Sequence, residues 1–209
     1  MLYPKFRYIY PPRPALYTLK QIDNFTEHYV AQLKLNGTRT GVVIYPDKSI
    51  EFWTRHKSLH KAYKVTDSMR DSLLSLDLAP RKFYYLDGEL LHSKSSLIKD
   101  TIVLYDIFVY RSKYLFGISY ADRLKQLQKI CRKPKILVKD KLAYRVNKNV
   151  WLIKSYKKNF TKIFNRAHNH PIIEGIVVKN TTAKLAYHFT HDKCSWMGKI
   201  RVPTNSYKL

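Results

Sequence analysis

The stretch AQLKLNGTRTGVVIY (residues 31–45) places Lys34 just before a glycine turn and an apolar run. Together with the following residues to position 55, it predicts a strand, a turn at Gly37, a second strand and a hairpin into a third. The chain holds 39 lysines and arginines. Lys34 is therefore either one more solvated charge or a lysine placed at a turn for chemistry.

The charge of the chain is its strongest global property. Against those 39 basic residues stand only 15 acids, which gives a formal net charge of +24. Such an excess predicts a polyphosphate partner, above all nucleic acid. The alternative is a lysine-rich composition inherited from a biased genome. A hydrophobic fraction of 45% is enough to bury a core.

The sequence also bears on location. No apolar run approaches the roughly 18 residues of a membrane span, and the first residues lack the apolar core of a signal peptide. Cys131 and Cys194 lie far apart and in no metal-binding spacing. We therefore expect an intracellular, cytoplasmic protein without membrane contact, located in the host cytoplasm if the source is viral.

The remaining pattern predicts one α+β domain over residues 1–209, with neither repeats nor linkers. Residues 1–20 are rich in Pro and Tyr, which predicts an extended arm packed on the body. Thr66 and Ser119 stand where helix N-caps are expected. The expected helices cover 66–78, 120–132 and part of 154–170, and the expected strands cover 81–92, 100–110, 172–180 and 194–203.

Five short motifs follow one another along the chain: KLNGTR (34–39), DGE (87–89), YDIF (105–108), EGIVVK (174–179) and WMGKIR (196–201). Each is weak alone. In this order, over nearly the whole chain, they resemble the covalent nucleotidyltransferase superfamily of ATP-dependent DNA ligases, RNA ligases and mRNA capping enzymes. The resemblance implies an ATP-grasp-like adenylation domain with antiparallel sheets flanked by helices. Because the chain ends soon after Trp196, we expect no OB-fold domain.

The resemblance makes Lys34 the nucleophile that attacks the α-phosphate of a nucleotide. A lysine amine attacks only when it is neutral, and neighbouring cations and a metal ion favour that state. Gly37 is expected to let backbone and nucleotide approach closely. Glu174 is expected near the lysine or a bound Mg²⁺, for which Mn²⁺ can substitute.

The other motif residues receive roles by the same resemblance. Tyr105 is expected to stack on the base, with Phe108 as the next candidate. Lys179 and Lys199 are expected to neutralise the α-phosphate and to act with Lys34 and Glu174 in catalysis. The expected nucleotide-binding residues are Leu33, Arg39, Glu89, Tyr105, Ile176, Lys179 and Lys199, and the expected nucleic-acid-binding residues are Arg55 and Arg201.

Three positions depart from the family pattern. Asn36 stands where many ligases carry an aspartate, which removes a carboxylate near Lys34. Gly198 lengthens the last motif by one residue relative to the common Trp-x-Lys-x-Lys form. Arg201 stands where many members have a second lysine.

These features predict an ATP-dependent polynucleotide ligase that joins 5′-phosphate and 3′-hydroxyl ends through a lysyl-AMP intermediate. The variation at Asn36 and the short chain favour RNA slightly over DNA as the substrate. The motif spacing, however, resembles that of small viral and phage DNA ligases equally well. We expect a monomer. The alternatives are a GTP-dependent guanylyltransferase of the mRNA-capping type and a non-catalytic nucleic-acid-binding protein on the same scaffold.

Overall fold

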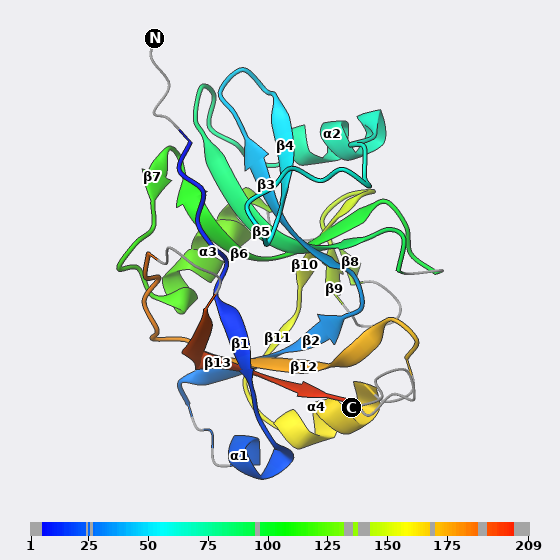
Figure 1. Ribbon diagram of the computed structural model, residues 1–209, viewed down its shortest axis with the longest axis vertical. Helices are drawn as coiled ribbons and strands as arrows, with labels where there is room; N and C mark the ends of the chain where they lie inside the picture. Colours follow the sequence, from blue (N-terminus) through cyan, green and yellow to red (C-terminus); the bar gives the residue numbers. More distant parts are fainter. Residues whose placement is uncertain are drawn as a thin grey trace.

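The apolar runs of the sequence form two β-sheets in the computed structural model, one above the other in Figure 1. The structure describes residues 6–23, 25, 27–94, 97–131, 136–137, 143–167, 170–187 and 192–202. The first five residues of the expected arm, and parts of the basic region 133–170, lie outside these residues.

The lower sheet in Figure 1 has five strands in the order β1-β13-β12-β2-β11. The pairing of β1 with β13 is parallel, and the other three pairings are antiparallel. The bounds are β1 Arg13–Leu16, β13 Lys193–Arg201, β12 Ile173–Asn180, β2 Tyr29–Leu35 and β11 Ser155–Tyr156.

The upper sheet has eight strands in the order β4-β3-β5-β6-β10-β9-β8, with β7 paired to β6. Here too one pairing, β10 with β6, is parallel, so both sheets are mixed rather than purely antiparallel. The bounds are β3 Thr38–Ile44, β4 Ile50–Thr54, β5 Tyr84–Leu91, β6 Thr101–Tyr110, β7 Lys113–Tyr114, β8 Ile136–Leu137, β9 Ala143–Arg145 and β10 Val150–Ile153.

The Asn36-Gly37 turn carries the chain from one sheet to the other. It joins β2 of the five-stranded sheet to β3 of the eight-stranded sheet, and the Asn36 amide donates to the carbonyl of Ile172 at 2.8 Å. A Cβ at Gly37 would lie 2.7 Å from both the Leu90 carbonyl oxygen and Cγ of Glu89. The glycine is thus required by close contact with β5, a reason additional to the expected approach of a nucleotide.

Four helices lie among the described residues, and two of them begin at the expected caps. Thr66 accepts from the amide of Met69 to start α2 (Asp67–Leu74), and Ser119 accepts from that of Asp122 to start α3 (Tyr120–Ile130). The α2 helix ends earlier than predicted, because Leu76 leaves the helical path to enter the core. The other two are α1 (Leu19–Asp23) and α4 (Phe160–Ala167).

The α4 helix is also shorter than the pattern over 154–170 predicts. Residues 155–156 pair with β2 as strand β11, and Asn159 has a φ of 61°, which interrupts the helical path before Phe160. Residues 168–169 lie outside the described part of the chain.

Each sheet has its own hydrophobic core. The eight-stranded sheet packs against α2 and α3 through side chains such as Met69, Phe108 and Leu127. The five-stranded sheet packs on α4 through Ile176, Val178 and Phe164. A third cluster, from both sheets, joins the two bodies and contains Leu35, Leu91, Val103, Ala143, Trp151, Ile153 and Ile172.

Every strand of the described residues belongs to one of these two sheets, so this part of the chain contains no separate OB-fold barrel. None of its helices has the length and apolar character needed to span a membrane. What the arrangement does provide is two facing walls, one from each sheet.

Candidate active site

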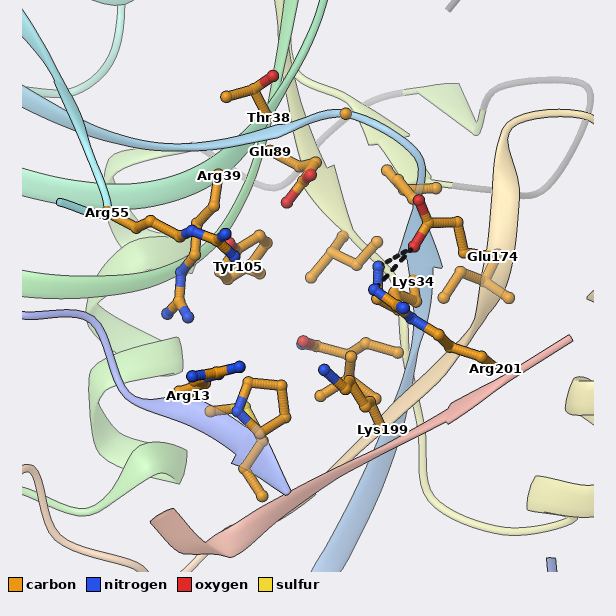
Figure 2. Close-up of a pocket in the computed structure, with 18 of the residues that line it drawn as sticks. Arg13, Lys34, Thr38, Arg39, Arg55, Glu89, Tyr105, Glu174, Lys199 and Arg201 are labelled. Atoms are coloured by element: carbon orange, nitrogen blue, oxygen red, sulfur yellow. Dashed lines mark hydrogen bonds and ion pairs between the residues drawn. The ribbon is translucent and has the colours of Figure 1, made fainter. Parts of the chain in front are cut away.

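A cleft of about 620 Å³ lies between the two sheets. Figure 2 shows that it collects side chains from motifs far apart in the sequence. Ten of the eleven predicted site residues line it, namely Leu33, Lys34, Arg39, Arg55, Glu89, Tyr105, Glu174, Lys179, Lys199 and Arg201.

The five-stranded sheet forms a wall rich in cations. In the strand register Gly175 of β12 lies between Lys34 of β2 and Arg201 of β13, and Val177 lies opposite Lys199. Directly opposed residues of an antiparallel pair point to the same face. The register therefore brings the cations of the first and last motifs onto one surface of the cleft.

Glu174 reaches this surface because of a β-bulge. The pairing of β12 with β2 shifts between Ile173 and Gly175, and Gly175 has a φ of 135°, a conformation that favours glycine. A bulge reverses the alternation of side chains beyond it. Glu174 therefore turns into the cleft, where its carboxylate forms an ion pair with the Lys34 ammonium and lies 3.9 Å from the Arg201 guanidinium.

Ile176 is the predicted residue that the structure places elsewhere. Its side chain is fully buried among Ala31, Phe164 and Val178 on the opposite face of the sheet. The neighbouring Val177 lines the cleft instead. The strand pattern EGIVVK alone did not reveal the bulge that decides which of the two faces inward.

The eight-stranded sheet forms the second wall, on which Arg39 of β3 lies opposite Glu89 of β5. The Arg39 guanidinium makes two hydrogen bonds to Asp87, from Nε at 3.1 Å and from Nη2 at 2.6 Å. Burial alone would lower the pKa of Arg39, but the Asp87 carboxylate raises it above its usual range. Arg39 is thus a fixed cation already neutralised by its own carboxylate.

Glu89, also on this wall, makes no such ion pair within the part of the chain that the structure describes. Burial raises its pKa to about 7, although Lys34 and Arg39 oppose that rise. The side chain is therefore balanced between its charged and neutral forms near neutral pH. A carboxyl group in that state can both accept and donate hydrogen bonds to ligand hydroxyls.

Tyr105 stands at a second irregularity. The register between β5 and β6 passes from Asp87 opposite Asp106 to Gly88 opposite Leu104, which leaves Tyr105 without a direct partner. Its ring lies at the cleft, with the Lys179 ammonium 4.8 Å from the ring centroid. Both walls therefore use a register shift to turn one side chain inward.

A buried hydrogen-bond network holds Lys179 beneath the cleft. The Tyr120 hydroxyl accepts from the Lys179 ammonium at 3.3 Å and from Gln32 Nε2 at 2.7 Å, and it donates to the Tyr105 carbonyl at 3.0 Å. Burial lowers the pKa of Lys179 to about 8, against the opposing effects of Asp106 and Asp87. Lys179 thus carries its charge at neutral pH and loses it in moderately alkaline solution.

Asp106, the acid of the YDIF motif, forms a buried ion pair next to this network beneath the cleft. It accepts two hydrogen bonds from the Arg123 guanidinium, at 2.9 Å from Nε and 2.8 Å from Nη2, and both side chains are almost fully buried. Arg123 also donates to the carbonyl of Ile118 at 2.8 Å. The pair ties α3 to β6 behind Tyr105, so its role is support rather than contact with a ligand.

Sequence reasoning missed Asp87, Gln32, Tyr120 and Arg13, which all help to build the cleft. Asp87 could have been found, because it precedes Glu89 by two residues in the same strand and so shares its face. The pairing of Tyr120 with Gln32 joins residues 88 positions apart and left no local signal. Asn36, conversely, is not among the lining residues of the cleft.

A family model described as RNA ligase matches residues 27–195, most of the chain. The chain belongs to the RNA ligase family. Comparison with curated protein sequences gives no match.

Solved structures show the same nucleotidyltransferase fold in DNA ligases. The ligase domain of LigD from M. tuberculosis superposes with a TM-score of 0.65 at 15% identity, over 92% of this chain and 60% of that one. The ATP-dependent DNA ligase of bacteriophage T7, in complex with ATP, gives 0.56 at 17% identity, over 92% of this chain and 68% of that one.

A Lig E DNA ligase, described as binding DNA with a minimal scaffold, gives a TM-score of 0.56 at 16% identity and covers 91% of this chain. This RNA ligase family chain spans 68% of the Lig E chain, but only 60% or less of several other matches. These likenesses establish the shared fold.

Proposed function

We propose that the protein is an ATP-dependent polynucleotide ligase acting through a covalent lysyl-AMP intermediate. The observation that carries the proposal is the position of Lys34, at the cleft, in an ion pair with Glu174 and within a wall of further cations. A nucleophilic amine needs a proton acceptor beside it and positive charge around the phosphate that it attacks. One group of residues supplies both requirements.

In the first step Lys34 Nζ gives a proton to the Glu174 carboxylate and becomes a neutral amine. Its electron pair forms a bond to the α-phosphorus of ATP. The bond from that phosphorus to the bridging oxygen breaks, and pyrophosphate leaves with the electrons. A second proton passes from the nitrogen to water, which leaves AMP joined to Lys34 by a phosphoramidate bond. Lys179 and Lys199 neutralise the charge that develops on the phosphate oxygens.

In the second step a 5′-phosphate oxygen of the nucleic acid attacks the same phosphorus. The bond to Nζ breaks, the nitrogen recovers a proton, and AMP now caps the 5′ end as a pyrophosphate. In the third step a 3′-hydroxyl loses its proton and attacks the 5′-phosphorus. AMP then leaves with the electrons of the broken bond, and the two ends are joined.

Recognition of the base supports ATP over GTP. Val177 and Tyr105 offer apolar and aromatic surfaces for a base, and Gln32 lies opposite Val177 on the same face. Gln32 Nε2 donates to Tyr120 and to Ser155 Oγ at 2.9 Å, and within the described chain its Oε1 accepts no hydrogen bond. An acceptor held in this way suits the 6-amino group of adenine and repels the 6-oxygen of guanine.

The residues of the cleft fit Mg²⁺ held mainly by the substrate. The described residues contain no cluster of three or more acidic, histidine or cysteine side chains that could hold an ion alone. Mg²⁺ commonly takes one or two carboxylates and completes its shell with phosphates and water. Glu174 and Glu89 would provide the carboxylates. The bound ion would supply positive charge to the phosphates.

The nucleic-acid partner is supported by the net charge of +24 and by Arg55 at the mouth of the cleft. Figure 2 shows Arg55 on the wall opposite Lys199 and Arg201. We propose nucleic acid with 5′-phosphate and 3′-hydroxyl ends as substrate, with RNA preferred over DNA in keeping with the family. A protein that contacts many phosphates loses affinity steeply as salt increases.

The first experiment incubates the protein with ATP or GTP labelled at the α-phosphate and then separates it on a denaturing gel. We expect label from ATP in the presence of Mg²⁺, and release of the label as AMP when nicked substrate is added. Label from GTP alone would make the protein a guanylyltransferase of the capping type. No label from either nucleotide, with intact binding to nicked duplex, would make it a non-catalytic binding protein.

The second experiment compares sealing of nicked duplexes that carry ribose or deoxyribose on each side of the nick. We expect faster sealing where the 3′-hydroxyl end is RNA. Equal or faster sealing of an all-DNA nick would contradict the RNA preference without affecting the ligase assignment.

A further inference from the structure

We propose that Arg13, on the N-terminal strand β1, binds a phosphate group in the cleft. This residue lies outside the five motifs. The inference deepens the proposed function and rests on it, because it assigns a further residue to the same reaction. Figure 2 shows the Arg13 guanidinium below that of Arg39 in this view, with Lys199 to its right. Arg13 and its neighbour Pro14 both line the cleft.

The segment that carries Arg13 is built into the site. Strand β1 runs parallel to β13, and the Arg13 amide donates to the Asp192 carbonyl at 3.2 Å. On the other wall, Arg39 Nη1 donates to the carbonyl of Pro12 at 2.6 Å. The backbone on both sides of the Arg13 side chain is thus held by the two walls of the cleft.

Gly198, the extra residue of the last motif, has its explanation in the same segment. A Cβ at Gly198 would lie 1.9 Å from the ring of Tyr17, which no side chain could accept. Tyr17 is fixed by its hydroxyl, which donates to the Ser195 carbonyl at 2.8 Å, and by its amide, which donates to Lys199 at 3.0 Å. The glycine therefore makes room for the ring that docks β1 beside the lysine of the motif.

The charges around Arg13 indicate what it binds. Arg39 and Arg123 each have a carboxylate partner at hydrogen-bond distance, whereas Arg13 has none within the part of the chain that the structure describes. Its neighbours are cations. Burial lowers the pKa of Lys199, and the positive charges of Arg201, Lys34 and Arg13 lower it further. These two arginines and two lysines outnumber the Glu174 carboxylate beside Lys34 and Arg201, and the excess positive charge favours entry of an anion.

The chemical class of that anion is a phosphate. A guanidinium binds two phosphate oxygens at once through parallel hydrogen bonds, which an ammonium group cannot do. The phosphate can belong to the nucleotide or to the 5′ end of the nucleic acid. Either phosphate would make the same contact with Arg13. The step of the reaction that an Arg13 substitution slows distinguishes the two.

The test compares the wild type with Arg13→Gln, Arg13→Lys and a matched control, Arg70→Gln, which removes an exposed arginine of α2. Calorimetry with inorganic tripolyphosphate measures phosphate binding without any chemistry. Labelling at varied ATP concentration measures KM for the nucleotide. Transfer of AMP from pre-labelled enzyme to a 5′-phosphorylated end isolates the second step. Thermal unfolding verifies that each variant is folded.

We expect Arg13→Gln to weaken tripolyphosphate binding about 10-fold, as for the loss of one charge-assisted hydrogen bond, and Arg13→Lys to recover part of it. Raised KM for ATP identifies the nucleotide phosphate as the ligand; slower transfer with unchanged KM identifies the 5′-phosphate. Wild-type behaviour of Arg13→Gln in all three measurements would overturn the assignment. If the wild type takes up no label, the proposed function fails, and tripolyphosphate binding still decides the role of Arg13.

Discussion

The two walls of the cleft carry opposite chemistry. The wall of the eight-stranded sheet offers an aromatic ring, Tyr105, a carboxyl group, Glu89, and an arginine that is neutralised by its own aspartate. The wall of the five-stranded sheet offers Lys34, Lys199 and other cations around a single carboxylate. A nucleotide has a neutral, hydroxyl-rich half and a polyanionic half. Tyr105 and Glu89 suit the first and the cations around Lys34 suit the second, while Gln32 and Val177 of the five-stranded sheet also face the base in our proposal.

From this difference we infer that the proposed nucleotide substrate is shared between two separately packed bodies. Substitutions of Tyr105 and Glu89 on the eight-stranded sheet should weaken binding of the nucleoside, whereas those of Lys34, Glu174 and Lys199 on the five-stranded sheet should slow transfer of the phosphate. The predictions below test that division, beginning with the largest effect.

Lys34→Ala should abolish covalent labelling by ATP, because among the described residues Lys34 is the lysine that pairs with Glu174. Binding to nicked duplex should remain nearly unchanged, since one charge among a net +24 contributes little to the overall field. Gel analysis of labelling and a filter-binding assay measure the two effects. The matched control is Lys158→Ala, an exposed lysine next to α4, which should label normally. Normal labelling of Lys34→Ala would show that another lysine is the nucleophile.

Asp106→Asn should destabilise the wall of the eight-stranded sheet, because it leaves the buried Arg123 guanidinium without its counter-charge. Breaking one side of a buried ion pair costs about 3–5 kcal/mol of unfolding free energy. Denaturant unfolding measures the loss. Asp71→Asn, an exposed acid of α2, is the matched control and should change stability little. Equal stability of both variants would mean that the Asp106 pair does not support the fold.

The two carboxylates of the cleft should respond differently to the same Glu→Gln change. Glu174→Gln should lower kcat for labelling about 100-fold with little change in KM, because it removes the proton acceptor beside Lys34. Glu89→Gln should instead raise KM for ATP about 10-fold, because it weakens contact with the ribose hydroxyls. Steady-state kinetics of labelling separate the two. A fall in kcat for Glu89→Gln as large as for Glu174→Gln would contradict the division between the walls.

Tyr120→Phe should move the alkaline limit of labelling to lower pH. Lys179 must be protonated to neutralise phosphate, and its pKa is about 8, so its contribution is lost as pH rises through that value. Removing the hydroxyl takes away an acceptor that stabilises the ammonium, which lowers this pKa further. The pH profile of the labelling rate shows the shift, with Tyr110→Phe as control. An unchanged profile would remove Tyr120 from the control of Lys179.

The lowered pKa of Lys179 also makes stability depend on pH, in the opposite direction to activity. A lysine whose pKa is lowered by folding binds fewer protons in the folded state than in the unfolded state between pH 8 and its ordinary pKa of 10.5. The contribution of Lys179 to unfolding free energy therefore increases with pH across this interval, while its contribution to activity decreases. Parallel measurements of stability and labelling distinguish the two effects.

Much of the site was predictable because its residues belong to short motifs of fixed order. Lys34, Glu89 and Lys179 were predicted from the resemblance of these motifs to the nucleotidyltransferase superfamily, and they line the cleft. Ile176 was predicted to bind the nucleotide, but its side chain lies on the face away from the cleft, beyond a bulge that the sequence does not mark. The helix caps at Thr66 and Ser119 were local features and are confirmed.

Other features depend on contacts that no local pattern encodes. The division into two sheets at Gly37, the parallel docking of β1 and the buried Tyr120 network all join residues far apart in the chain. For this reason Arg13 was expected only as part of an arm, and Gly198 only as a departure from the family pattern. Both gain a physical explanation from the pairing of β1 with β13.

Identification of the modified residue tests the central claim most directly. The wild-type protein is incubated with ATP and Mg²⁺, digested, and its peptides are analysed by mass spectrometry under conditions that preserve a phosphoramidate. The account predicts one added AMP, on the peptide that contains Lys34, and its loss when pyrophosphate is supplied to reverse the step. AMP on any other residue, or an unmodified Lys34 in a protein that seals nicks, would contradict it.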